Sequence, residues 1–263
     1  MSKKLFTDYK KIWWSTHNTM ETLYHFIKDY KIDVDDYGNI TVSNTHKHAT
    51  VPVFCCHLDT VHEDKPFPSV VKDDLLMSLN QNGIGGDDKC GIVACLELLK
   101  KIPCKVIFFR DEERGCRGAK TYNQKTLKDN LFMVEIDRKG NSDLIFNGRL
   151  SGTMASKEFI KDVCKIGKEF GFKEETGLFT DVSCLDDTGI SRMNVSCGYY
   201  LPHSSKEYVL LSELQNTIDL CYALGSRLNK QYKHVAEVLK VLDTEEGQLW
   251  LGGEYGYFQK ENE

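Results

Sequence analysis

Short apolar runs alternate along this sequence with segments whose apolar residues recur at helical spacing. The runs are short and rich in β-branched and aromatic residues, so we expect strands at residues 32–35, 40–42, 51–56, 105–109, 131–136 and 195–200. The helical spacing predicts helices over residues 18–30, 88–101, 115–122, 157–170 and 212–228. Strands that alternate with helices pair into a largely parallel sheet covered by helices. The sequence therefore predicts an α/β fold, a three-layer domain with a mixed, mainly parallel central sheet flanked by helices.

The length and composition suit one such domain. The chain has 263 residues, of which 41% are hydrophobic and 28% are charged, as is ordinary for a globular protein with a sizeable core. No repeat or low-complexity linker divides it. We therefore expect a single domain over residues 1–241 and a C-terminal tail over residues 242–263, whose Glu- and Gly-rich composition predicts partial flexibility.

The charge and the cysteine usage narrow the class of protein. A formal net charge of −5 argues against a nucleic-acid-binding surface, which is usually basic. No uncharged apolar run is long enough to span a membrane, and the N-terminus lacks the features of a signal peptide. The ten cysteines form no CxxC pair, and several sit in apolar segments, which is typical of reduced, buried cysteine. We expect a cytoplasmic protein that binds neither nucleic acid nor membrane.

His57 and Asp59 follow the apolar run 51–56. Alternation at a strand end points both side chains to the same side. The imidazole can ligate a metal, and the carboxylate can then accept the other ring N–H and fix the tautomer. An ordinary histidine beside a solvated aspartate would give the same pattern, so this motif alone decides nothing.

Asp87 and Asp88 follow the glycine-rich turn 83–86 and stand at the start of a predicted helix. Two adjacent acids at this place could simply cap the helix. A carboxylate has two oxygens, however, and can instead bridge two cations. The residues alone leave both interpretations open.

Asp111, Glu112 and Glu113 form an acidic run soon after the strand predicted over 105–109. Three adjacent acids are electrostatically costly unless cations compensate them. Neighbouring glutamates also permit a division of roles, in which one ligates a metal and the other stays off it as a general base. The alternative is a solvated acidic loop neutralised by nearby arginines.

Asp137 closes an apolar strand, and His203 lies just past another one; each is unremarkable alone. Together with the motifs above they complete a set of two imidazoles and three carboxylates: His57, Asp87, Glu113, Asp137 and His203, with Glu112 to spare. Such donors suit zinc, manganese or cobalt. Two metals about 3.5–4 Å apart would share one carboxylate and one water.

In this order the motifs resemble those of the co-catalytic di-zinc peptidases, which include peptidase T-like tripeptidases, carboxypeptidase G-type enzymes and zinc aminopeptidases. They are His-x-Asp-Thr from residue 57, Gly-x-Asp-Asp-Lys from residue 85, and Asp-Glu-Glu-x-Gly-x-x-Gly-Ala from residue 111. An aspartate after a strand and a late histidine follow. The resemblance extends from about residue 36 to residue 209 and implies the fold and the amide-hydrolysing activity of that group.

The resemblance implies a role for each metal ligand. Asp87 would bridge both metals, His57 and Asp137 would complete one site, and Glu113 and His203 would complete the other. The implied cofactors are two divalent metals, first of all Zn2+, with Mn2+ or Co2+ as alternatives.

It also implies the catalytic residues. Asp59 would orient His57, and Glu112 would take a proton from the bridging water and deliver it to the leaving amine. Asp181 matches a position behind the ligands in some relatives. Tyr200 and Arg149 are candidate donors to the oxyanion of the transition state.

One departure concerns the chain between Asp137 and His203. In the tripeptidase and carboxypeptidase branches an extra lid or dimerisation domain interrupts this interval, whereas here it is short. We therefore expect one catalytic domain without an inserted lid.

These features predict a metal-dependent exopeptidase, aminopeptidase or tripeptidase-like, that acts on short peptides. An amidohydrolase of N-acyl amino acids or cell-wall peptides would use the same metals. A catalytically silent binding protein that kept the fold is the alternative outside the enzymes. The sequence leaves the oligomeric state open.

Overall fold

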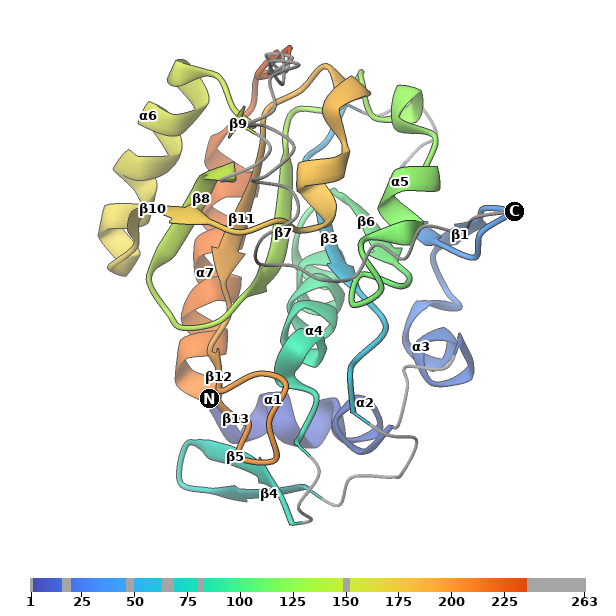
Figure 1. The fold of residues 1–263 in the computed structure, drawn as a ribbon, viewed down its shortest axis with the longest axis vertical. Helices are drawn as coiled ribbons and strands as arrows, with labels where there is room; N and C mark the ends of the chain where they lie inside the picture. The colour runs from blue at the N-terminus through green and yellow to red at the C-terminus, as the bar shows by residue number, and fades with distance from the viewer. Residues whose placement is uncertain are drawn as a thin grey trace, which may run out of the picture.

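The computed structural model describes residues 2–15, 20–45, 50–62, 69–79, 83–148 and 152–235. A nine-stranded sheet runs through the centre of this part of the chain (Figure 1). Its strands lie in the order β1 (Lys31–Val34), β2 (Ile40–Ser43), β6 (Lys105–Phe109), β3 (Val53–His57), β7 (Met133–Arg138), β11 (Arg192–Ser196), β8 (Asp143–Gly148) and β10 (Lys173–Gly177), and β9 (Gly152–Thr153) pairs with β8. The four strands β6, β3, β7 and β11 are parallel, and antiparallel pairs flank them. The predicted α/β fold with a mixed, mainly parallel sheet is confirmed.

The central strands are buried on both faces. On β3, Val53 and Cys55 belong to one buried cluster, whereas Phe54 and Cys56 belong to the other. Successive side chains of a strand point to opposite faces, so a strand covered on both sides has no polar position. This explains the uninterrupted apolar run that ends at His57.

Helices cover both faces of the sheet, which confirms the three predicted layers (Figure 1). On one face lie α4 (Gly86–Lys101), α6 (Lys157–Gly167) and α7 (Leu211–Arg227), and their buried apolar side chains belong to the larger cluster. A 3-10 turn, η2 (Lys168–Phe170), continues α6. The other face is covered by α5 (Arg117–Thr121) and by the 3-10 turns η1 (Gln124–Thr126), η3 (Asp181–Cys184) and η4 (Asp186–Thr188).

The N-terminal residues form helices that the sequence analysis did not predict. These are α1 (Ser2–Asp8) and α2 (Lys10–Trp14), followed by α3 (Met20–Ile27) within the helix predicted over 18–30. Trp13 is fully buried, and its indole N–H donates to the carbonyl of Leu5 at 3.2 Å. The ammonium group of Lys89 donates to the carbonyls of Trp13 and Ser15 at 3.2 and 2.9 Å. The start of α4 is thereby tied to the N-terminal helices.

A second, four-stranded antiparallel sheet lies below the first (Figure 1). Its strands lie in the order β12 (Tyr199–Tyr200), β13 (Tyr208–Leu210), β5 (Leu75–Ser78) and β4 (Ser69–Lys72). The single strand predicted over 195–200 is therefore wrong in extent, because the chain leaves β11 and enters β12 through Gly198, whose φ is 87°. This change of sheet carries the chain towards His203.

Between Asp137 and His203 the described residues belong to the elements of this fold. The absence of an inserted lid remains a prediction, and the predicted tail over 242–263 lies outside the described residues. Within the described part of the chain, no helix combines the length and the apolar character that crossing a membrane requires.

Candidate metal centre

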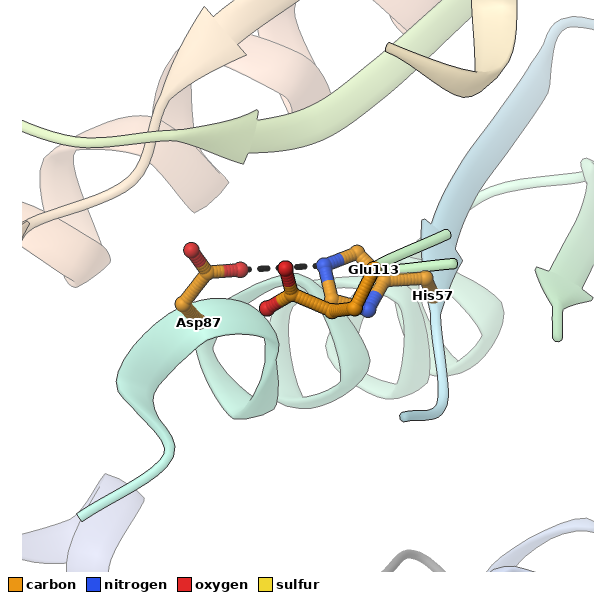
Figure 2. A group of neighbouring side chains, drawn as sticks. All are labelled: His57, Asp87 and Glu113. Atoms are coloured by element: carbon orange, nitrogen blue, oxygen red, sulfur yellow. Dashed lines mark hydrogen bonds and ion pairs between the residues drawn. The ribbon is translucent and has the colours of Figure 1, made fainter. Parts of the chain in front are cut away.

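His57, Asp87 and Glu113 point towards one another from three separate segments (Figure 2). His57 ends β3 and is 1% exposed. Its Nε2 atom lies 2.9 Å from Oδ1 of Asp87 and 3.7 Å from Oδ1 of Asp137. One imidazole and two carboxylates thus form a first group.

A second group forms around His203. Its Nε2 atom lies 3.3 Å from Oδ2 of Asp87 and 3.0 Å from Oε1 of Glu113. The His203 side chain is half-exposed, whereas those of Asp87 and Glu113 are largely buried. Oδ1 of Asp87 therefore faces one histidine and Oδ2 faces the other. The structure brings all five sequence-predicted ligands together, with Asp87 between the two groups.

Asp88, the second acid of the pair, accepts hydrogen bonds from backbone N–H groups. Its Oδ1 accepts the backbone N–H of Gly91 at 2.8 Å, and its Oδ2 accepts that of His57 at 3.3 Å. Any Cβ on Gly91 would lie 2.3 Å from Oδ2 of Asp88 and 2.3 Å from the carbonyl oxygen of Ile136, so only glycine fits here. Asp88 thus bonds to the first turn of α4, as the capping interpretation expects, while Asp87 faces the two histidines, and its role as a metal bridge stays a prediction.

Asp59 connects the first histidine to the acidic loop. Its Oδ1 lies 3.5 Å from Nδ1 of His57 and accepts the backbone N–H of Glu112 at 3.0 Å. Its Oδ2 accepts the N–H of Glu113 at 3.1 Å. Burial raises the pKa of Asp59, but the neighbouring His57 and the backbone N–H of Glu112 outweigh it and leave the pKa below its ordinary value.

Asp137 is held by residues that the sequence analysis did not single out. Tyr199 donates its hydroxyl to Oδ1 at 3.1 Å, and Thr180 donates to Oδ2 at 3.4 Å. The side chain of Asn194 bonds to the backbone N–H and carbonyl of Asp137 at 3.0 and 2.7 Å. Asp181 is fully buried behind this group, and neither of its carboxylate oxygens has a hydrogen-bond partner among the described residues.

Glu112 lines the same cavity as these ligands but belongs to neither group. Burial raises the pKa of its carboxyl, Asp137 and Glu113 raise it further, and the result is about 8. The thiol of Cys116 donates to its Oε1 at 3.6 Å. Glu112 is therefore a carboxyl group beside the ligands whose pKa is raised in the metal-free protein, and bound cations would lower it again.

The donors fit divalent cations. Hydrogen bonds to Asp87 and Glu113 raise the pKa of His203 to about 10 in the metal-free protein. Burial lowers the pKa of His57, but Asp137 and the other neighbouring carboxylates outweigh it and raise the pKa well above its ordinary value. Each imidazolium thus supplies the positive charge that a cation would bring to these carboxylates. Imidazole nitrogen and carboxylate oxygen are ligands that zinc prefers.

The centre opens into a cavity of about 230 Å³. Besides the ligands, its walls include the apolar residues Ile145, Leu178 and Phe179. Of the two candidate oxyanion donors, Tyr200 instead donates its hydroxyl to Glu213 at 2.6 Å, and Arg149 lies outside the described residues. The cavity is large enough for one side chain or a short peptide end.

Solved structures of low sequence identity share this fold. Aminopeptidase PepT from Bacillus cereus superposes with a TM-score of 0.73 at 14% identity, over 88% of this chain and 99% of that one. A tripeptidase from Staphylococcus aureus gives 0.69 at 15% identity, over 87% and 98%. An aminopeptidase from Desulfurococcus kamchatkensis gives 0.64 at 14% identity, over 86% and 95%. A search of proteins with curated descriptions finds no match.

A family model establishes the relationship more directly. The model of peptidase family M28 matches residues 39–211. This range covers more than half of the chain and contains every candidate ligand from His57 to His203. The chain therefore belongs to peptidase family M28.

Proposed function

We propose that this protein is a two-metal exopeptidase that removes residues from the N-terminus of short peptides. One observation carries the proposal: the two carboxylate oxygens of Asp87 face two separate histidines, at 2.9 and 3.3 Å. A carboxylate in this position suits a bridge between two cations. His57 and Asp137 would hold one cation, and Glu113 and His203 the other.

Two bound divalent cations would supply Lewis acidity, which lowers the pKa of water and polarises a substrate carbonyl. Glu112 is the proposed general base. It lies in the cavity without belonging to either ligand group, and it would receive a proton from the attacking water and pass it to the leaving amine.

Asp59 is the proposed positioning residue for this step. The same carboxylate faces His57 and accepts the backbone N–H groups of Glu112 and Glu113. It therefore fixes the first histidine relative to the base and to one ligand.

The substrate class follows from the cavity and from the relatives. A cavity of about 230 Å³ suits a single side chain or a short peptide end. Leu178 and Phe179, which are 56% and 43% exposed, give the cavity an apolar wall. The structural relatives named above are described as aminopeptidases and a tripeptidase, which supports short peptides with a free amine as substrates.

A substrate panel tests the proposal. Metal-depleted protein is loaded with Zn2+ or Mn2+ and assayed on aminoacyl chromogens, tripeptides and their N-acetylated forms. We expect hydrolysis of the free-amine substrates and its loss in Glu112→Gln. Turnover of acylated substrates alone would assign the site to an amidohydrolase, and no turnover in metal-loaded protein would contradict both.

A further inference from the structure

Three loops of the metal centre meet at one buried carboxylate, that of Glu207. This residue is 2% exposed and lies four positions after His203. Its Oε2 accepts the backbone N–H of Gly85 at 2.7 Å and lies 2.8 Å from Nε2 of His62. Its Oε1 accepts the backbone N–H of Asp87 at 3.0 Å.

The first consequence concerns the orientation of Asp87. The backbone from Gly85 to Asp87 wraps around the Glu207 carboxylate, and Gly85 adopts a φ of 64° to do so. A Cβ on Gly86 would lie 3.3 Å from Oε1 of Glu207 and 2.8 Å from the side chain of Val209, so the loop packs closely against strand β13. Two N–H bonds to one fixed carboxylate set the direction in which the Asp87 side chain leaves the backbone.

The second consequence concerns His203, which shares a turn with Glu207. The N–H of Glu207 donates to the carbonyl of Ser204 at 3.2 Å, and the hydroxyl of Ser204 donates to the carbonyl of Leu201 at 2.8 Å. His203 itself is half-exposed and has a φ of 60°. Because little packing holds the imidazole, its place depends on this turn. Glu207 therefore ties together Asp87 and His203.

The third contact reaches the chain that follows β3. His62 comes five residues after His57, and its imidazole is largely buried. A Cβ on Gly83 would lie 2.3 Å from the His62 ring and 2.6 Å from the carbonyl of Ser204, so the three loops pack without a gap. The carboxylate of Glu207 lies at the point where they join.

Glu207 is not itself suited to bind a metal. Both of its oxygens already face N–H groups, and its side chain is fully buried. We propose that Glu207 is a positioning residue that sets the affinity of the metal site formed by Asp87, Glu113 and His203. This inference rests on the metal-binding part of the proposed function, and it names a residue that acts through the ligands.

The test is a zinc titration of metal-depleted protein against a chromophoric chelator. In Glu207→Gln an NH₂ group replaces one carboxylate oxygen and cannot accept a hydrogen bond from a backbone N–H, while the side chain keeps its volume. Loss of a partner behind a metal ligand typically costs about 10–100-fold in metal affinity. Because Asp87 faces both histidines, we expect this loss to be larger for the zinc equivalent held by Asp87, Glu113 and His203 and smaller for the other. The KM for a peptide should change little when zinc is saturating.

Glu213→Gln is the matched control. Glu213 lies in the first turn of α7 and bonds to Tyr200 and Asn141, away from the ligands, so both zinc affinities should be unchanged. Circular dichroism and the thermal midpoint of the metal-free proteins establish that each variant is folded. If Glu207→Gln does not fold, Glu207→Asp takes its place. The shorter aspartate keeps the negative charge but moves the carboxylate away from the N–H groups of Gly85 and Asp87.

The outcomes separate this inference from the proposed function. Two zinc affinities equal to those of the parent protein in the folded Glu207 variant would overturn the positioning role, whatever the protein hydrolyses. A parent protein that binds two zinc ions but cleaves no peptide would contradict the proposed activity and leave the positioning role in place.

Discussion

Oδ1 of Asp59 accepts a 3.0 Å hydrogen bond from the backbone N–H of Glu112. The same oxygen lies 3.5 Å from Nδ1 of His57, and the other oxygen accepts the N–H of Glu113. One carboxylate thus holds the end of β3 and the acidic loop after β6 in a fixed relation. The distance between the proposed base and the first metal group depends on this side chain.

Asp59→Asn should therefore impair the centre while leaving its ligands in place. The amide keeps one acceptor oxygen and puts an NH₂ group in place of the other, so the loop loses an N–H acceptor in either orientation, and in one of them the imidazole loses its partner as well. We expect activity to fall about 10–100-fold. Steady-state kinetics at saturating zinc measure the loss. The exposed Asp33→Asn on β1 is the control, and an Asp59→Asn protein as active as this control would exclude a positioning role.

Glu112→Gln should abolish proton transfer without removing metal. We expect a fall in kcat of about 100- to 10,000-fold, as for loss of a general base. Zinc content, measured by atomic absorption, should remain at two equivalents, because Glu112 belongs to neither ligand group. A variant with near-normal kcat would show that another group carries the proton.

Metal binding should release protons and become tighter as pH rises. Hydrogen bonds to Asp87 and Glu113 raise the pKa of His203 to about 10, so its imidazolium persists at neutral pH and competes with the cation. Each displaced proton strengthens zinc affinity about tenfold per pH unit below that pKa. Titration calorimetry in buffers of different ionisation enthalpy counts the protons. The His203→Gln variant should release one proton fewer on binding zinc. Equal zinc affinities of the parent protein at pH 6 and pH 8 would contradict the prediction.

Gly91→Ala should disturb both the fold and the centre. The added Cβ would lie 2.3 Å from Oδ2 of Asp88 and from the carbonyl of Ile136, which is backbone and precedes Asp137. Overpacking of this kind costs about 1–3 kcal/mol. Urea unfolding of the metal-free protein measures the stability, and a zinc titration measures the centre. Unchanged stability and unchanged zinc affinity would mean that α4 shifts freely against β7, contrary to the close contact between Gly91 and Ile136.

Glu97→Gln should lower stability at neutral pH. Tyr9 donates its hydroxyl to Glu97 at 2.6 Å, and Lys100 donates to the same oxygen at 3.1 Å. Burial raises the pKa of Glu97, but these bonds outweigh it and lower the pKa. A depressed carboxyl pKa contributes stability above the ordinary pKa, and that contribution is lost as pH falls through the folded value.

We therefore expect a loss of about 1–2 kcal/mol at pH 7 that shrinks towards pH 3. Urea unfolding at both pH values measures it. Glu175→Gln, in an exposed pair with Lys173, should change nothing measurable and serves as the control. A loss of stability that is the same at both pH values would mean that the ion pairing of Glu97 does not cause it.

Three of the candidate ligands, His57, Glu113 and Asp137, could be predicted because they lie at or soon after the ends of apolar strands. Burial on both faces makes β3, β6 and β7 conspicuous in the sequence, and parallel strands bring their carboxyl ends to one edge. The N-terminal helices carried a weaker signal that was missed. Leu5, Tyr9, Ile12 and Trp13 recur at helical spacing and are all buried, but the helices are short and rich in lysine.

Other features left no local trace in the sequence. Strand β10 consists of Lys-Glu-Glu-Thr-Gly, and four of its five residues are exposed, so only its pairing with β8 defines it. Glu207 has its effect through backbone N–H groups that lie 120 and 122 residues away in the chain. No pattern of side chains reveals such a contact, because every residue except proline carries the same N–H group.

The spread of the ligands along the chain has a consequence for how the protein is made. His57, Asp87 and Glu113 leave the ribosome well before His203, and the parallel strands between them pair only after long crossover connections. The second ligand group therefore cannot close until nearly the whole domain has been synthesised and folded. In the proposed two-metal protein, a partly made chain would therefore lack one set of ligands, and only the finished molecule would carry a complete hydrolytic centre.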